Sequence, residues 1–91
     1  MSVNSTQGIG TLTNATKTFS VTEGYKKISL SVTSASTGTC TITGATIADL
    51  STNSIALNAG ENLNIVSGFP INDLVVVAAT GCTVNIVASQ N

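Results

Sequence analysis

The sequence has no histidine, tryptophan or arginine, and only one proline, among its 91 residues. The absence of histidine excludes catalytic triads with an imidazole base and metal sites with imidazole ligands. Charged residues make up 8% of the chain, against about 25% in an average soluble domain, and the net charge is −1. With no basic cluster to follow a phosphate backbone, we do not expect nucleic acid as a partner.

Carboxylates are also scarce, because the chain has only four, at Glu23, Asp49, Glu61 and Asp73. Each stands alone at an expected turn or strand end, whereas acid–base catalysis needs two that converge on one site. The nearest approximations to a calcium loop are Asn72-Asp73 and Asn58 with Glu61, which we interpret as turn residues. We therefore expect a protein that is not an enzyme, without catalytic, cofactor-binding or metal-binding residues.

Long hydrophobic runs are missing as well. No stretch approaches the ~20 apolar residues of a membrane helix, so we expect no membrane partner. Residues 1–7 show neither the basic nor the apolar region of a signal peptide, which predicts synthesis in a cytosol.

From Lys17 onward, apolar residues alternate with Ser, Thr and Asn in short segments separated by Gly, Asn and Asp. This period of two predicts strands with one wet face, for example over residues 27–33, and a hairpin around residues 58–61. No segment shows a helical period. The pattern predicts an all-β, antiparallel β-sandwich, jelly-roll-like, with about seven short strands. We expect an N-terminal arm over residues 1–15 and the sandwich over residues 16–91.

The longest apolar run is residues 74–79 (LVVVAA), which predicts a strand with two dry faces. In a two-sheet sandwich only one of these faces meets the core, so Val75 and Val77 need another cover. Either they are partly exposed, which is common for single valines, or another copy of the chain packs on them. On the second interpretation, Val75, Val77 and Val87 form the subunit interface.

Two further segments have alternative interpretations. Residues 1–15 are either a loosely held terminus or an arm that lies across a neighbouring subunit, anchored by Ile9 and Leu12. Tyr25 is either an ordinary strand-edge residue with outward parity or a contact for a partner, such as a sugar that stacks on its ring. We take Ile9, Leu12 and Tyr25 as candidate partner contacts.

The two cysteines, Cys40 and Cys82, fall on predicted inward positions. They serve either as small hydrophobic residues or as a disulfide, which would stabilise the fold by ~3–4 kcal/mol. Folding in a cytosol favours the reduced form.

Residues 55–65 (IALNAGENLNI) and 74–86 (LVVVAATGCTVNI) resemble small all-β virion proteins of tailed bacteriophages. The likeness is one of style, spans residues 53–88, and is nearest to capsid decoration (cement) proteins and head-fibre bases. It implies a non-enzymatic protein made in the host cytoplasm, trimeric, that binds the major capsid protein on the outer lattice and stabilises it. Its location would be the capsid surface of the virion.

The main alternative is a carbohydrate- or receptor-binding β module of a phage tail fibre. Such a module usually displays several aromatic rings or a calcium site, and this chain offers Tyr25 alone. A pilin-like or surface-layer subunit would require an export signal.

Overall fold

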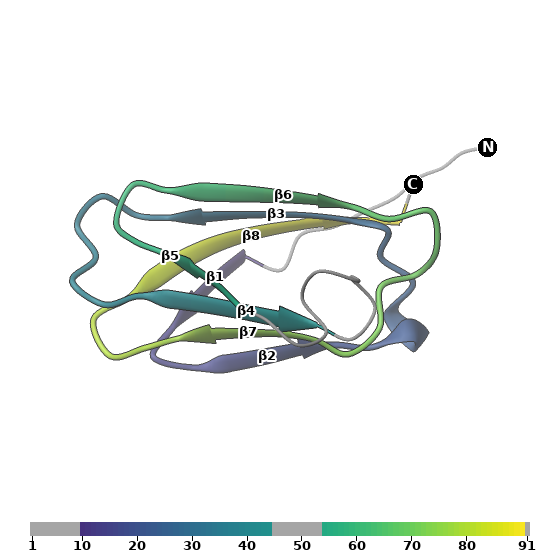
Figure 1. Cartoon of the computed structure of the whole chain (residues 1–91), viewed down its shortest axis with the longest axis horizontal. Coiled ribbons are helices and arrows are strands. Elements are labelled where there is room, and N and C mark those ends of the chain that lie inside the picture. Colours follow the sequence, from purple (N-terminus) through teal and green to yellow (C-terminus); the bar gives the residue numbers. More distant parts are fainter. Residues whose placement is uncertain (1–9, 45–53, 91) are drawn as a thin grey trace.

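The computed structural model describes residues 10–44 and 54–90, and there it is an all-β sandwich with one turn of 3-10 helix, η1 (Val21–Glu23). Figure 1 shows the strands in two layers. In chain order they are β1 (Gly10–Thr13), β2 (Thr16–Phe19), β3 (Lys27–Val32), β4 (Cys40–Gly44), β5 (Ile55–Leu57), β6 (Asn62–Val66), β7 (Leu74–Ala78) and β8 (Thr83–Ser89).

Each layer is a four-stranded antiparallel sheet. Sheet A has the order β1-β8-β3-β6, and sheet B has the order β2-β7-β4-β5. Every strand of the first half of the chain pairs with its mirror-image strand in the second half: β1 with β8, β2 with β7, β3 with β6 and β4 with β5. The chain therefore folds like one long hairpin that is rolled into two layers, with β3–β8 and β4–β7 as the additional contacts.

The alternation in the sequence builds the core between the sheets. In β3, Ile28, Leu30 and Val32 are buried while the intervening residues are exposed, because successive side chains of a strand point to opposite faces. No polar side chain is buried within the described residues. The buried residues are Phe19, Ile28, Leu30, Val32, Cys40, Ile42, Leu57, Ile65, Ile71, Leu74, Val76, Ala78, Cys82, Val84, Ile86 and Ala88.

The predicted antiparallel sandwich is confirmed, with eight strands in the described residues where about seven were expected. The additional strand, β1, lies in the segment predicted as an arm, where Gly10 and Thr13 pair with Ile86 and Thr83 of the same chain. The arm can therefore extend only over residues 1–9, which lie outside the described residues.

The predicted hairpin around residues 58–61 is wrong. β5 pairs with β4 in sheet B, whereas β6 pairs with β3 in sheet A, so the turn between them crosses from one layer to the other. A period of two shows that a segment is a strand and which side is apolar, but it does not choose the partner strand.

In the single chain, β7 is dry on its inner face only, as expected for a two-sheet sandwich, and a cover for its outer face stays a prediction. Leu74, Val76 and Ala78 are buried in the core, while Val75 is half-buried and Val77 is 37% exposed on the outer side. β7 lies between β2 and β4, so its edges are covered even though its outer face is not. Complete shielding of that face would require a second molecule.

Candidate functional site

The outer surface of sheet B is built from two rows of side chains in register. Thr16 of β2 lies opposite Val77, which lies opposite Thr41 of β4, and Ala56 of β5 completes the row. The second row runs from Thr18 through Val75 to Thr43. We call this set the Thr/Val face: Thr16, Thr18, Thr41, Thr43, Ala56, Val75 and Val77.

The strands of sheet B place no charged side chain on the Thr/Val face. Lys17, the one charge in these strands, occupies an inward register position opposite Val76. All side chains of the face are short, and all but Ala56 are β-branched, so they lose little rotamer entropy when they are covered. The face can therefore be buried without desolvating a charge, and its threonine hydroxyls can exchange hydrogen bonds across a contact.

The third residue predicted for the subunit interface, Val87, lies elsewhere. It is on the outer face of sheet A, 61% exposed, and opposite Ser29 of β3. That face is a ladder of amides and hydroxyls, in which the Ser29 hydroxyl donates to Asn64 Oδ1 at 2.7 Å and the Thr11 hydroxyl donates to Asn85 Oδ1 at 3.2 Å. The structure brings Val75 and Val77 together and separates Val87 from them.

Of the three candidate partner contacts, two are described, and both pack partly against this chain's own core. Leu12 on β1 is half-buried against the core. The Tyr25 ring packs edge-on against Phe19, with centroids 6.1 Å apart. Tyr25 was expected to point outward, but it precedes the first residue of β3 and does not follow the parity of that strand. Ile9 lies outside the described residues.

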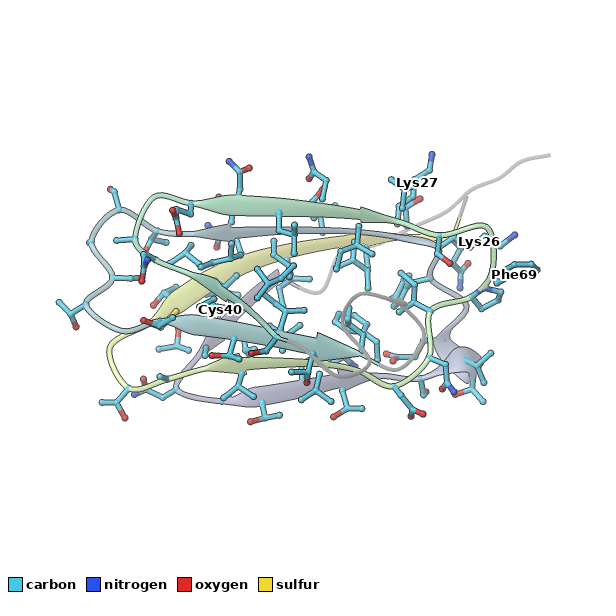
Figure 2. All side chains as sticks on the ribbon, in the orientation of Figure 1. Lys26, Lys27, Cys40 and Phe69 are labelled. Atoms are coloured by element: carbon cyan, nitrogen blue, oxygen red, sulfur yellow. The ribbon has the colours of Figure 1, made fainter. Side chains whose placement is uncertain are left out.

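A group that sequence reasoning missed lies at the end of the sandwich where β6 leads into β7. Phe69 is 77% exposed and Val66 is 72% exposed, the highest values among the large hydrophobic residues that the structure describes. Lys27 lies opposite Val66 in the β3–β6 register, and Lys26 is the residue before Lys27. Figure 2 shows Lys26, Lys27 and Phe69 at this end of the molecule. We call Lys26, Lys27, Val66 and Phe69 the Phe69 corner.

Two other charged residues near this end pair with each other. Lys17 Nζ lies 2.7 Å from Glu23 Oε2, and the Ser20 amide donates to Glu23 Oε1 at 2.9 Å. Partial burial acts to raise the pKa of Glu23, but the Lys17 and Ser20 hydrogen bonds and the Lys17 charge outweigh it, so the pKa lies below its usual value. Lys17 and Glu23 thus neutralise each other and fix η1 to β2.

Cys40 and Cys82 are free thiols and are fully buried. Burial raises the pKa of the Cys40 thiol to about 11, and the proximity of Cys82 adds to the shift. Cys40 lies inside the sandwich in Figure 2, away from the Phe69 corner. A thiol in this state is a packing residue and not a nucleophile.

The two approximations to a calcium site serve the backbone. Asn72 Oδ1 accepts from the Val21 amide at 3.0 Å, and Glu61 Oε1 accepts from the Asn58 amide at 2.7 Å. Over residues 10–44 and 54–90, no three histidine, cysteine, aspartate or glutamate side chains gather into a group that could hold a metal ion. Glu61 therefore makes the local turn hydrogen bond that the sequence indicates, whereas Asn72 joins two segments that are distant in the sequence.

A scan against protein-family models, a search of curated proteins and a search of solved structures find no significant match to this chain. The function must therefore be inferred from the surfaces described above. In the described part of the chain, no helix is long and apolar enough to cross a membrane.

Proposed function

We propose that this protein is a non-enzymatic structural subunit that self-associates through the Thr/Val face and binds the outer surface of a viral capsid as a decoration protein. The observation that carries the proposal is the absence of charge from this face, in the strands of a chain whose net charge is already near zero. Copies of such a face can meet around a rotation axis, three of them in a trimer, without like-charge repulsion and without burying an unpaired ion.

The fold supports a virion role. The strand orders β1-β8-β3-β6 and β2-β7-β4-β5 fit a jelly roll, a double-sheet fold that recurs in viral capsid proteins and in lectins. Since one fold serves many functions, the assignment to a capsid rests on the resemblance of residues 53–88 to phage decoration proteins. That resemblance also implies a trimer and the major capsid protein as partner.

Val87 is not part of the interface that we propose. It lies on the opposite face of the sandwich from Val75 and Val77. A contact that joined two opposite faces would repeat by translation and give an open stack of subunits, whereas a decoration protein needs a closed oligomer. We therefore assign the interface to Val75 and Val77 and use Val87 as a control.

Sedimentation velocity at low micromolar concentration tests the self-association. We expect a species near three times the 9.1 kDa subunit mass for the wild type and a 9.1 kDa monomer for Val77→Asp. Val87→Asp, which places the same charge on a more exposed position, should remain oligomeric. Circular dichroism checks that both variants are folded. A monomeric wild type would remove the basis of the proposal.

Capsid binding is the second test. Purified protein is mixed with capsids that were assembled without it, and binding is followed by co-sedimentation and negative-stain microscopy. Binding to capsids but not to tails is expected for a decoration protein. Binding to isolated tails alone would favour the tail-fibre alternative.

The alternative has one structural observation in its favour, which is the amide and hydroxyl ladder on sheet A, because such groups bind sugar hydroxyls. Its predicted stacking residue, Tyr25, is half-buried against Phe19, which leaves little open ring for a sugar. Glycan-array binding that Tyr25→Ala abolishes would support the alternative. We expect no glycan signal.

A further inference from the structure

We infer that the Phe69 corner is a docking point for an acidic protein surface with an apolar pocket, which accepts the Phe69 ring. This inference deepens the proposed function, since the partner surface would be that of the capsid. It rests on the exposure of the corner, on its fixed geometry and on its charge.

The Phe69 corner contains the two most exposed large hydrophobic side chains of the described residues. Phe69 and Val66 are more open to water than Val87, Val21 or Val77, the other large hydrophobic residues exposed in the described residues. They lie three residues apart, one at the end of β6 and one in the connector that follows. A large aromatic ring left in water next to a second apolar side chain is typical of a binding site, because exposed aromatic residues often anchor protein interfaces.

The ring is presented on a fixed loop. The Ser67 amide donates to the Lys26 carbonyl at 2.8 Å, and the Ile71 amide donates to the Tyr25 carbonyl at 2.7 Å, so hydrogen bonds hold the connector on both sides of Phe69. The Phe69 amide itself donates to Ser67 Oγ at 3.2 Å. Ile71 is fully buried and anchors the end of the loop. A backbone held in this way loses little conformational entropy on binding.

The charge of the corner determines the chemistry of the partner. Lys26 and Lys27 form no ion pair within the described residues, whereas Lys17 is neutralised by Glu23. Of the described acids, Glu61 lies in the β5–β6 turn at the other end of β6, and Asp73 precedes β7 in the other sheet. Two positive charges that form no ion pair within residues 10–44 and 54–90, next to an apolar anchor, complement carboxylates around an apolar pocket.

Two other classes of partner fit less well. One phenyl ring and one valine offer too little apolar area for stable insertion into a membrane. A sugar site usually pairs its ring with a set of hydrogen-bond acceptors and donors, whereas the corner offers ammonium groups only. An acidic protein surface uses all four side chains.

Retention on a resin whose ligand carries a phenyl group and a carboxylate tests the chemistry without any assumption about capsids. At pH 7 the wild type should be retained, although its net charge is −1. Phe69→Ala and the double variant Lys26→Gln/Lys27→Gln should elute at clearly lower salt, and Val87→Ala, an exposed valine on another surface, should elute with the wild type. Equal retention of wild type and Phe69→Ala would overturn the inference.

Binding to capsids that lack the protein then identifies the partner. We expect Phe69→Ala to weaken capsid binding at least tenfold, the lysine double variant to weaken it and reduce its salt dependence, and Val87→Ala to bind normally. If the wild type binds capsids and Phe69→Ala binds equally well, the inference fails and the proposed function stands. If the wild type does not bind capsids but its retention on the resin depends on Phe69, the proposed function fails. The inference that the corner binds an acidic surface with an apolar pocket then still holds.

Vesicles of phosphatidylserine and phosphatidylcholine test whether the corner binds a membrane instead. We expect no flotation of the wild type with these vesicles. Flotation that is lost in Phe69→Ala would assign the corner to a membrane and overturn the inference.

Discussion

Gly38 lies with its α-carbon against the backbone carbonyl of Thr80, so that a Cβ atom at position 38 would collide with this oxygen and come within 3.1 Å of the Cys82 amide nitrogen. The contact joins the loop after β3 to the β7–β8 turn, where the Thr37 amide also donates to the Gly81 carbonyl at 2.9 Å. We expect Gly38→Ala to lower the free energy of unfolding by about 1–3 kcal/mol, since the backbone must move to admit the methyl group. Urea denaturation followed by circular dichroism measures the change.

Gly68→Ala is the matched control. A Cβ atom at Gly68 would meet no other atom within 4 Å, and Gly68 is not among the described glycines with positive φ. We expect the free energy of unfolding to change by less than about 0.5 kcal/mol. If both variants lose the same stability, close packing at Gly38 is not the cause.

The strands were predictable because the alternation in this chain is regular. In β3 and β8, every inward position that the sequence marked is buried. The pairing was not predictable, because β5 and β6 follow each other around a good turn sequence and still belong to different sheets. The choice of partner depends on how the whole chain rolls into two layers, and a local pattern contains no information about that.

Of the candidate site residues, the sequence pattern indicated some and gave no sign of others. Val75 and Val77 stood out because they interrupt the alternation that most other strands keep, and the structure places them on one face. Phe69 gave no signal, because a single aromatic residue between Gly68 and Pro70 belongs to no period. In the folded connector Phe69 is exposed while Ile71, two residues later, is fully buried.

Glu23 should make the stability depend on pH in the acid range. Its pKa is lower in the folded protein than in the unfolded chain, so its stabilising effect is present above the unfolded value of about 4.3 and is lost as the pH falls through the lower folded value. Lys17 and Glu23 are partly exposed, so we expect a loss of only about 0.5–1 kcal/mol. Urea denaturation between pH 7 and about pH 3 should show a shallower decline for Glu23→Gln than for the wild type.

Glu61→Gln controls for the loss of a carboxylate in general. Glu61 accepts a backbone hydrogen bond from Asn58, as Glu23 does from Ser20, but it takes part in no ion pair of the described residues. Any flattening of the decline in Glu61→Gln reports the loss of a carboxylate that has a backbone hydrogen bond alone, and the additional flattening in Glu23→Gln reports the Lys17 pair. A Glu23→Gln variant that declines as steeply as the wild type would show that the Lys17 pair contributes nothing measurable.

The thiols should be inert in the folded protein. Burial raises the pKa of Cys40 to about 11, so at pH 8 the reactive thiolate is almost absent. We expect an aromatic disulfide reagent to modify neither cysteine on the time scale of minutes in native buffer and both in urea, and the intact mass without reductant to match the reduced chain. Rapid modification of the native protein, or a mass two units lower, would contradict this.

The same shift predicts a loss of stability in alkali. Above the ordinary thiol pKa of about 8.5, the unfolded chain releases a proton that Cys40 retains in the folded state, so the free energy of unfolding falls as the pH rises toward 11. Urea denaturation at pH 8 and pH 10.5 measures the loss. Cys40→Ala, although less stable at both values, should lose less between them.

Salt should affect self-association through the Thr/Val face and binding through the Phe69 corner differently. The Thr/Val face has no charge to screen, so the oligomer at low micromolar concentration should persist in 1 M NaCl, where the screening length is about 3 Å. Docking at the Phe69 corner uses Lys26 and Lys27, so capsid binding should weaken as the salt rises from about 0.1 M to 1 M. Sedimentation velocity and co-sedimentation with capsids, performed in the same buffers, measure both. An oligomer that dissociates in 1 M NaCl would show that ionic contacts, which the Thr/Val face cannot supply, hold the subunits together.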